Sequence, residues 1–417
     1  MQPTLFDLIA TGVFALAILH TFAAKQLERV ASRSPRHAGI FHLLSEVEVV
    51  FGFWAIVLMA ILAMFQGAAE VVAYVESRNY TEPLFVFAIM VVAASRPIVS
   101  AVANVVNTLS RWLPVRVPLA QVWLGLAAVP LLGSLITEPA AMTIAALLLA
   151  PVAFRRDIPE APKYLAIGVL FVNISIGGTL SSYAAPPILM VAETWGWSTP
   201  FMLATFGWKA ALAVAINATV AMLVLRRYLL RVALQERVID PVPLPIVLVH
   251  FALLFCIVVF AHHPVIFIGL LLMFLGIAHA YERHQNPLIL REALLVGFFL
   301  AGLVVLGGLQ RWWLQPVIGS LDDLELFLGA LSLTAITDNA ALTYLGSLSG
   351  QITDDAKYWL VAGAVAGGGL TVIANAPNPA GASLLEKGFA DQTISAGGLL
   401  AGALLPTLIA AAAFALL

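Results

Sequence analysis

Long apolar stretches separated by short polar segments run along almost the whole chain. A helix that crosses a membrane needs about 20 mainly apolar residues. Stretches of about this length predict transmembrane passes at residues 4–24, 46–66, 83–107, 163–192, 202–225, 245–261, 264–281, 292–310, 358–385 and 393–416. The pattern therefore predicts an all-α polytopic membrane protein with about ten passes.

Two further apolar stretches, residues 119–154 and 322–349, carry a polar cluster at their centre. The cluster reads Thr-Glu-Pro at 137–139 in the first stretch and Thr-Asp-Asn at 337–339 in the second. Each half of either stretch is too short for a comfortable span. We therefore expect two re-entrant hairpins with polar tips near the middle of the membrane, where irregular backbone must be covered by protein or water.

Two of the predicted passes are interrupted by Gly, Pro and hydroxyl or amide residues, at 177–187 and at 368–379. Proline removes a backbone donor and clashes with the preceding turn, which frees carbonyl groups. Gly and Pro are common in membrane helices, so one such segment could be a simple kink. Two of them, each shortly after a hairpin, favour two broken helices whose freed carbonyls line a binding site.

The two halves of the chain share landmarks in one order, which predicts an internal repeat. Arg111-Trp112 matches Arg311-Trp312, residues 137–143 match 337–343, Lys163-Tyr164 matches Lys357-Tyr358, Gly177-Gly178 matches Gly368-Gly369, and Ala185-Pro186 matches Ala376-Pro377. We assign repeat 1 to residues 1–240 and repeat 2 to residues 241–417. Each repeat holds an odd number of passes, so we expect the second copy to be inverted in the membrane.

Composition agrees with a membrane protein. Apolar residues make up 61% of the chain and charged residues 11%, against roughly 45–50% and about 25% in soluble domains. Most of the 21 Lys and Arg residues fall in the loops that this arrangement places on one side. By the positive-inside rule, the N- and C-termini are then predicted on the outer side of a bacterial-type inner (plasma) membrane.

Charge and cysteine content exclude other classes. The net charge is −2 and there is no basic cluster with interleaved aromatic residues, so no nucleic-acid partner is expected. The single cysteine, Cys256, cannot form an internal disulfide or a cysteine-based metal site. The chain has no metalloprotease, phosphate-loop or nucleophile-elbow motif, so we predict neither an enzyme nor an ATP-driven pump.

Two acids at the hairpin tips, Glu138 and Asp338, are the main candidates for chemistry. A charge near the bilayer centre costs at least ~2.5–3.5 kcal/mol, so two such residues at matching positions indicate a function. Burial favours the protonated carboxyl, whereas a bound cation favours the carboxylate, so each acid could exchange a proton for a cation. The alternative is that an acid caps the exposed N–H groups of the following helix.

Neutral oxygens of the tips and breaks complete the candidate ion site. They belong to Thr137, Thr337, Asn339, Ser181, Ser182, Asn375 and Asn378. Hydroxyl, amide and carbonyl oxygens are the ligands that hard cations prefer. We therefore expect a Na⁺ site at these residues together with the two acids, and no other cofactor.

The tip sequence Thr-Asp-Asn-Ala-Ala at 337–341 and the Gly-rich breaks resemble the ion transporter superfamily. This group includes sodium/proton antiporters, arsenite permeases and citrate or dicarboxylate carriers, and residues 1–417 look like its Na⁺/H⁺ antiporter branch. The resemblance implies a homodimer with a scaffold domain and a transport domain that moves in an elevator-like manner. Glu138-Pro139 departs from the family pattern, which usually has Asn there, and the first break lacks Asn.

The residues and the resemblance together predict a secondary active transporter, a cation/proton (Na⁺/H⁺) antiporter, whose partners are the lipid bilayer, a small cation and a proton. Glu138 and Asp338 would alternate between proton and cation. The alternative is a Na⁺- or H⁺-coupled carrier for organic anions or oxyanions. Two acids would repel an anion unless they were protonated or neutralised, and neither tip carries Lys or Arg. A channel is less consistent with hairpins and broken helices, which favour alternating access.

Overall fold

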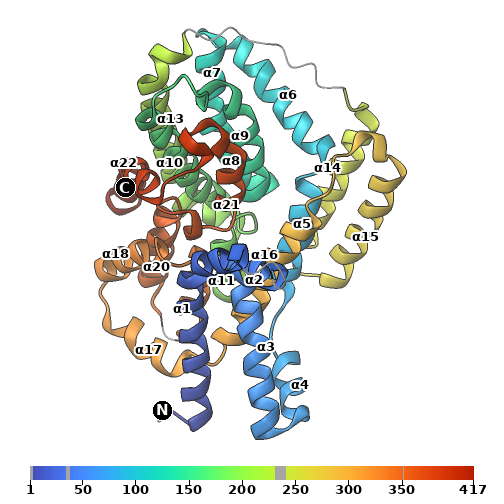
Figure 1. Ribbon diagram of the computed structural model, residues 1–417, viewed down its shortest axis with the longest axis vertical. Coiled ribbons are helices and arrows are strands. Elements are labelled where there is room, and N and C mark those ends of the chain that lie inside the picture. The colour runs from blue at the N-terminus through green and yellow to red at the C-terminus, as the bar shows by residue number, and fades with distance from the viewer. Residues whose placement is uncertain (1–2, 34–37, 231–240, 351) are drawn as a thin grey trace.

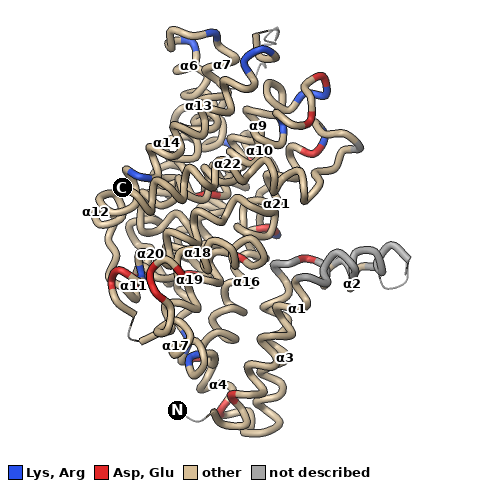
Figure 2. The backbone as a smooth tube through the Cα atoms, turned by 90° about the vertical axis from the view of Figure 1, so that its left-hand side faces the viewer, with Lys and Arg blue, Asp and Glu red and all other residues tan. Residues whose placement is uncertain are grey.

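The computed structural model describes residues 3–33, 38–230, 241–350 and 352–417, and within these ranges it consists of helices without strands (Figure 1). Three of the basic residues, Arg36, Arg231 and Arg237, lie outside the described residues. The predicted repeat boundary at 240/241 lies at the edge of an undescribed range. In the two views, α3 (Val47–Gln66) and α4 (Ala68–Glu76) form one end of the molecule, and the junction of α6 (Arg96–Trp112) with α7 (Val117–Leu126) forms the other, where several Lys and Arg residues gather (Figure 2).

Several helices are long and apolar enough to cross a membrane, as expected for a polytopic membrane protein. In the described chain five qualify, at Val49–Gln66, Glu160–Leu180, Thr199–Leu229, Leu290–Gly307 and Ala396–Leu416, or up to seven if each of two bent pairs is one span. Shorter apolar helices lie at Leu5–Thr21, Glu138–Ala153, Leu244–Val259 and Pro264–Ala280. The count of about ten passes thus stays a prediction.

The predicted pass at 83–107 is not one continuous helix. It consists of α5 (Thr81–Ala93) and α6, whose axes differ by 64°. The chain is extended at Ser95, the N-cap of α6, and Pro97 follows in the first turn, where its missing N–H costs nothing. The apolar pattern did not reveal this bend, because apolar residues continue on both sides of it.

Each predicted hairpin contains helices that meet at the expected polar tip. In the first, α7 and α8 (Ala128–Ile136) are bent by 41°, and α9 (Glu138–Ala153) follows after the single residue Thr137. In the second, α18 (Asp323–Thr334) is followed by α19 (Asn339–Ser347). The structure thus has helices that meet at both polar tips, and the re-entrant hairpins within a membrane stay a prediction.

Both predicted interruptions are present. The first separates α10 (Glu160–Gly177) from α11 (Pro186–Trp195) by a short 3₁₀ turn at Gly178–Leu180. The second separates α20 (Asp354–Gly367) from α21 (Asn378–Leu385) by a 3₁₀ turn at Val372–Ala374. Each second half begins with proline in its first turn, where the missing N–H costs nothing.

The broken helices pack across one another. The second arm of each hairpin contacts the second half of the other broken helix, so α9 packs on α21 and α19 packs on α11. Glycines allow each break to approach the first arm of its own hairpin. A Cβ atom on Gly177 would lie 2.7 Å from the Pro130 carbonyl oxygen, and one on Gly367 would lie 2.5 Å from that of Leu331.

The long helix α22 (Ala396–Leu416) lies along α10 and is fixed at both ends by tyrosines. The Tyr164 hydroxyl accepts a hydrogen bond from the Ser395 backbone N–H (3.1 Å), and the Tyr358 hydroxyl donates to the Phe414 carbonyl (2.6 Å). These tyrosines belong to the Lys-Tyr pairs that matched in the sequence. The two Arg-Trp pairs are different: Arg111-Trp112 ends α6, whereas Arg311-Trp312 begins α17, so they do not mark equivalent positions.

The remaining helices surround this group or extend from it. They are α1 (Leu5–Arg33), α2 (Ala38–Ser45), α12 (Thr199–Met202) continued through a π turn into α13 (Trp208–Leu229), α14 (Leu244–Val259), α15 (Pro264–Ala280), α16 (Leu290–Gly307) and α17 (Arg311–Ser320). Helix α16 packs against α3 and α5, and α14 and α15 pack against α5. Helix α16 also contacts α1 and α19, which places α1, α3 and α16 beside the second hairpin.

We predict that Gly402→Ala destabilises the protein. A Cβ atom at this position on α22 would overlap the Tyr164 carbonyl on α10, and such overpacking costs about 1–3 kcal/mol. Gly397→Ala is the control, because nothing lies within 4 Å of a Cβ atom there. Thermal unfolding of purified protein in detergent should show a lower Tm for Gly402→Ala only, and equal Tm values would contradict the observed helix contact.

Candidate functional site

The Glu138 carboxyl is fully buried at the first position of α9. Its Oε2 atom accepts a hydrogen bond from Nδ2 of Asn375 (2.8 Å), which lies in the second break. Its Oε1 atom is buried and has no hydrogen-bond partner within the described chain. No side-chain cap is formed at the start of α9, so the capping interpretation does not apply to Glu138.

The backbone of the first break lies directly against this carboxyl. A Cβ atom on Gly178 would lie 2.5 Å from Oε1 of Glu138 and 3.0 Å from Cβ of Ala185. Only glycine leaves room for the carboxyl at this point. The first break and the first tip therefore form one wall of the site, and Asn375 from the second break forms another.

The single residue between α8 and α9, Thr137, adopts a positive φ of 84°. This conformation is unfavourable for a residue with a branched side chain and costs roughly 1–3 kcal/mol. Thr137 is 2% exposed, and its Oγ1 atom has no hydrogen-bond partner among the described residues. Strain of this kind persists where the surrounding packing holds it, and it often marks a functional site.

Asn378 is the second amide of the second break. Its Nδ2 atom donates to the Gly368 carbonyl (2.8 Å) and to the Thr371 carbonyl (2.9 Å), which ties the interrupted backbone together. Both amide hydrogens are therefore used. The Oδ1 atoms of Asn375 and Asn378 are buried without a hydrogen-bond partner in the described ranges.

At the second tip, Asn339 is the fully buried first residue of α19. Its Nδ2 atom donates to Oγ of Ser175 (3.3 Å), and that hydroxyl donates to the Val365 carbonyl (2.8 Å). The Asn339 Oδ1 atom is buried and unpartnered in the part of the chain that is described. Sequence reasoning missed Ser175, because one serine inside an apolar helix carries no local signal.

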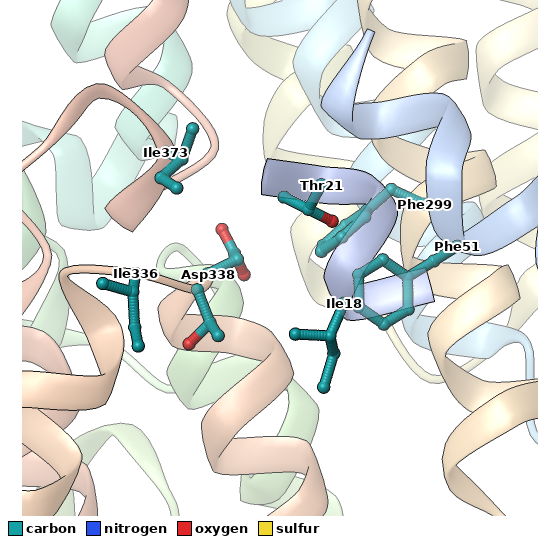
Figure 3. Close-up of a pocket in the computed structure, with 8 residues that line it drawn as sticks. Ile18, Thr21, Phe51, Phe299, Ile336, Asp338 and Ile373 are labelled. Atoms are coloured by element: carbon teal, nitrogen blue, oxygen red, sulfur yellow. The ribbon is translucent and has the colours of Figure 1, made fainter. Parts of the chain in front are cut away.

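Asp338 is the N-cap of α19. Its Oδ1 atom accepts hydrogen bonds from the backbone N–H groups of Ala340 (2.8 Å) and Ala341 (3.2 Å), so the capping interpretation is confirmed for this acid. Asp338 is half-buried and also borders a small pocket (Figure 3). The pocket is otherwise lined by Ile18, Thr21, Phe51, Phe299, Ile336, Thr337 and Ile373. The Asp338 carboxyl therefore caps α19 and borders the pocket at the same time.

Three of the predicted hydroxyl ligands are engaged elsewhere. Oγ1 of Thr337 donates to the Leu333 carbonyl (2.8 Å). Oγ of Ser181 donates to the Ser134 carbonyl (2.7 Å), and Oγ of Ser182 lies 3.1 Å from Oγ1 of Thr199. The two serines thus fasten the first break to α8 and α12, and the structure does not bring their hydroxyls to the Glu138 carboxyl.

The helix starts change the correspondence between the two tips. Glu138 and Asn339 are each the first helical residue, whereas Thr137 and Asp338 are each the N-cap. The sequence match had paired Glu138 with Asp338, one residue out of register with these helix starts. Each tip consequently contributes one carboxyl, but at non-equivalent places.

Helix ends of both kinds surround the site. The N-termini of α9 and α19 carry partial positive charge, which favours the two carboxylates. The C-termini of α10 and α20, at Gly177 and Gly367, carry partial negative charge, which favours a cation. Within the described residues no cluster of three or more His, Cys, Asp or Glu side chains could hold a metal ion.

A model of one protein family, described as "Putative Na+/H+ antiporter", matches residues 5–417, which is nearly the whole chain. No curated protein matches the chain significantly.

We predict that the two carboxyl positions differ in accessibility. In a Cys256→Ser background, Asp338→Cys should react with a small water-soluble methanethiosulfonate at least several-fold faster than Glu138→Cys, because Asp338 borders the pocket and Glu138 is fully buried. Mass spectrometry of the purified protein follows the modification, and the cysteine-free parent gives the baseline. Equal rates at the two positions would show that Glu138 is not more deeply buried than Asp338 in solution.

Proposed function

The chain belongs to the putative Na⁺/H⁺ antiporter family, and we propose that it is a secondary active transporter that exchanges Na⁺ or a similar monovalent cation for H⁺. One observation carries the proposal. Five buried oxygens at the tips and breaks accept no hydrogen bond within the described chain: Oε1 of Glu138, Oγ1 of Thr137, and Oδ1 of Asn339, Asn375 and Asn378.

The residues that carry these five atoms are connected: the Asn378 backbone N–H donates to the Asn375 carbonyl (3.0 Å), and Thr137 immediately precedes Glu138. Glu138 is bonded to Asn375, Asn378 is bonded to Gly368, and the Gly368 backbone abuts Asn339, since a Cβ atom there would lie 2.9 Å from Nδ2 of Asn339. A buried acceptor without a donor is unfavourable by about 1–3 kcal/mol. A bound cation removes that cost for several oxygens at once, and oxygen ligands suit hard cations such as Na⁺.

A single negative charge beside neutral oxygens favours a monovalent cation. Oε2 of Glu138 is occupied by the Asn375 amide, which leaves Oε1 as the atom that would hold either a proton or the cation. In the exchange cycle, release of the cation on one side leaves a buried carboxylate, which takes up a proton before the site returns. The anion-carrier alternative gains no support, because four of the five unpartnered atoms are carboxyl or amide carbonyl oxygens, which repel an anion, and only the Thr137 hydroxyl could donate to one.

Asp338 is the second proposed coupling residue. Its carboxylate is stabilised as the cap of α19 and faces the pocket that lies against α1, α3 and α16. A cation that enters this pocket meets Asp338 before the sealed oxygens behind it. Thr337 remains a candidate ligand through its backbone, and Ser181 and Ser182 become supports of the break.

The larger architecture is part of the same proposal. The order hairpin, broken helix, long helix occurs twice, as α7 to α13 and as α18 to α22, and the second hairpin arms pack crosswise on the opposite breaks. This arrangement supports inverted repeats within an elevator-like transport domain, with α1, α3, α5 and α14 to α16 as scaffold. A homodimer in a bacterial-type inner membrane, with both termini outside, follows from the sequence and the family resemblance.

The test is a dye-quench assay in everted vesicles from an antiporter-deficient strain. With a proton gradient imposed, Na⁺ or Li⁺ should cause dequenching with the wild-type protein. Glu138→Gln and Asp338→Asn should abolish the response, because neither side chain can then exchange a proton for a cation. Asp323→Asn, which neutralises an exposed acid at the far end of α18, should retain it. Exchange that persists in both tip variants would refute the proposal.

A backbone variant tests the site without removing a charge. Gly178→Ala should abolish exchange, because the added Cβ would lie 2.5 Å from Oε1 of Glu138, the atom proposed to bind the cation. Gly276→Ala on α15 is the matched control, since nothing lies within 4 Å of its Cβ position. Immunoblots of the vesicles establish equal amounts of protein. Full activity of Gly178→Ala would place the cation site elsewhere.

A further inference from the structure

We propose that Ser175 is a positioning residue that turns the carbonyl oxygen of Asn339 toward the transported cation. This inference rests on the proposed function and deepens it. Ser175 lies on α10, 164 residues before Asn339 in the chain, and it is fully buried. Its hydroxyl therefore links the first broken helix to the tip of the second hairpin.

The two hydrogen bonds of the Ser175 hydroxyl determine the orientation of the Asn339 amide. A serine hydroxyl has one hydrogen to donate, and that of Ser175 goes to the Val365 carbonyl (2.8 Å). Toward Asn339 the hydroxyl can only accept, so it must face the Nδ2 side of the amide, at 3.3 Å. The Oδ1 atom is then turned away from Ser175, and it is one of the five unpartnered oxygens.

The surroundings leave the pair little freedom. A Cβ atom on Gly368 would overlap the Ser175 hydroxyl and lie 2.9 Å from Nδ2 of Asn339, so both groups lie against the bare backbone of the second break. The carbonyl of the same glycine accepts from Asn378. Ser175 thus lies where α10, α19 and α20 meet, in contact with the network that holds the unpartnered oxygens.

Loss of this hydroxyl affects Asn339 more than any other group. The Val365 carbonyl keeps a second hydrogen bond, from the Gly368 N–H (3.3 Å), so it is not left without a partner in Ser175→Ala. The Asn339 amide, in contrast, loses the acceptor that distinguished its two ends. The Asn339 amide can then rotate so that its NH₂ group, rather than its oxygen, faces the proposed cation site. An N–H donor cannot bind a cation, so cation binding becomes weaker.

The test is the cation dependence of exchange in Ser175→Ala. The apparent KM for Na⁺ should rise by about 2- to 12-fold, the effect of one net hydrogen bond, while the maximal rate stays near that of the wild type. A purely structural defect would instead lower the amount of folded protein and the maximal rate. Ser175→Cys removes the strong acceptor while nearly preserving volume, so it should show the same KM increase.

A double-mutant cycle identifies Asn339 as the intermediary. In an Asn339→Ala background, Ser175→Ala should cause no further increase in KM. Ser134→Ala is the matched control: Ser134 is also buried, and its hydroxyl likewise donates to a break carbonyl, that of Gly177 (2.7 Å), but it accepts from the Leu180 backbone and holds no amide of the site. Its effect should be the same with and without Asn339.

The outcomes separate this inference from the proposed function. Exchange by the wild type, with an unchanged KM in both Ser175 variants or with additive effects of Ser175→Ala and Asn339→Ala, would overturn the role of Ser175 and leave antiport intact. Absence of cation-dependent exchange in the wild type, with the protein present in the membrane, would overturn the proposed function itself and this inference with it.

Discussion

Burial of the Glu138 carboxyl between two interrupted helices is the constraint on which the site depends. A charge at the centre of a bilayer costs at least ~2.5–3.5 kcal/mol, and a buried carboxylate is stable only with close compensation. Here the compensation comes from the Asn375 amide and from the N-terminus of α9. The α9 N-terminus and the Asn375 amide meet at Glu138 because the tip of the first hairpin and the second break lie at the same place.

The breaks in turn depend on close backbone contact. Gly177 and Gly367 let the two broken helices touch the first arms of their hairpins, at Pro130 and Leu331, and Gly178 makes room for the carboxyl itself. Side chains at these points would separate the segments and admit water. The two halves therefore use one packing solution, although they place their acids differently: Glu138 begins a helix and lies sealed, whereas Asp338 caps a helix and borders a pocket.

The sequence predicted the features that depend on local pattern. Polar clusters inside apolar stretches located both tips, and Gly with Pro located both breaks, because these residues change backbone preferences where they stand. The structure pairs Glu138 with Asn339 as first helical residues, one position away from the sequence match with Asp338. This shift was not predictable, since it depends on the positive φ of Thr137. The bend between α5 and α6 and the role of Ser175 also escaped, because both are defined by packing or by a partner far along the chain.

The direction of each polar group follows from which neighbours have already used its hydrogens. Asn375 gives an N–H to a carboxylate oxygen, Asn378 gives both to backbone carbonyls, and Asn339 gives one to a serine. Each amide thus has its nitrogen held by an acceptor and its oxygen left over. Because each nitrogen already donates to an acceptor, the three amides present carbonyl oxygens rather than N–H groups; for Asn375 that acceptor is Oε2 of the Glu138 carboxyl itself. In the proposed function, preference for a cation then depends also on the contacts that orient these amides.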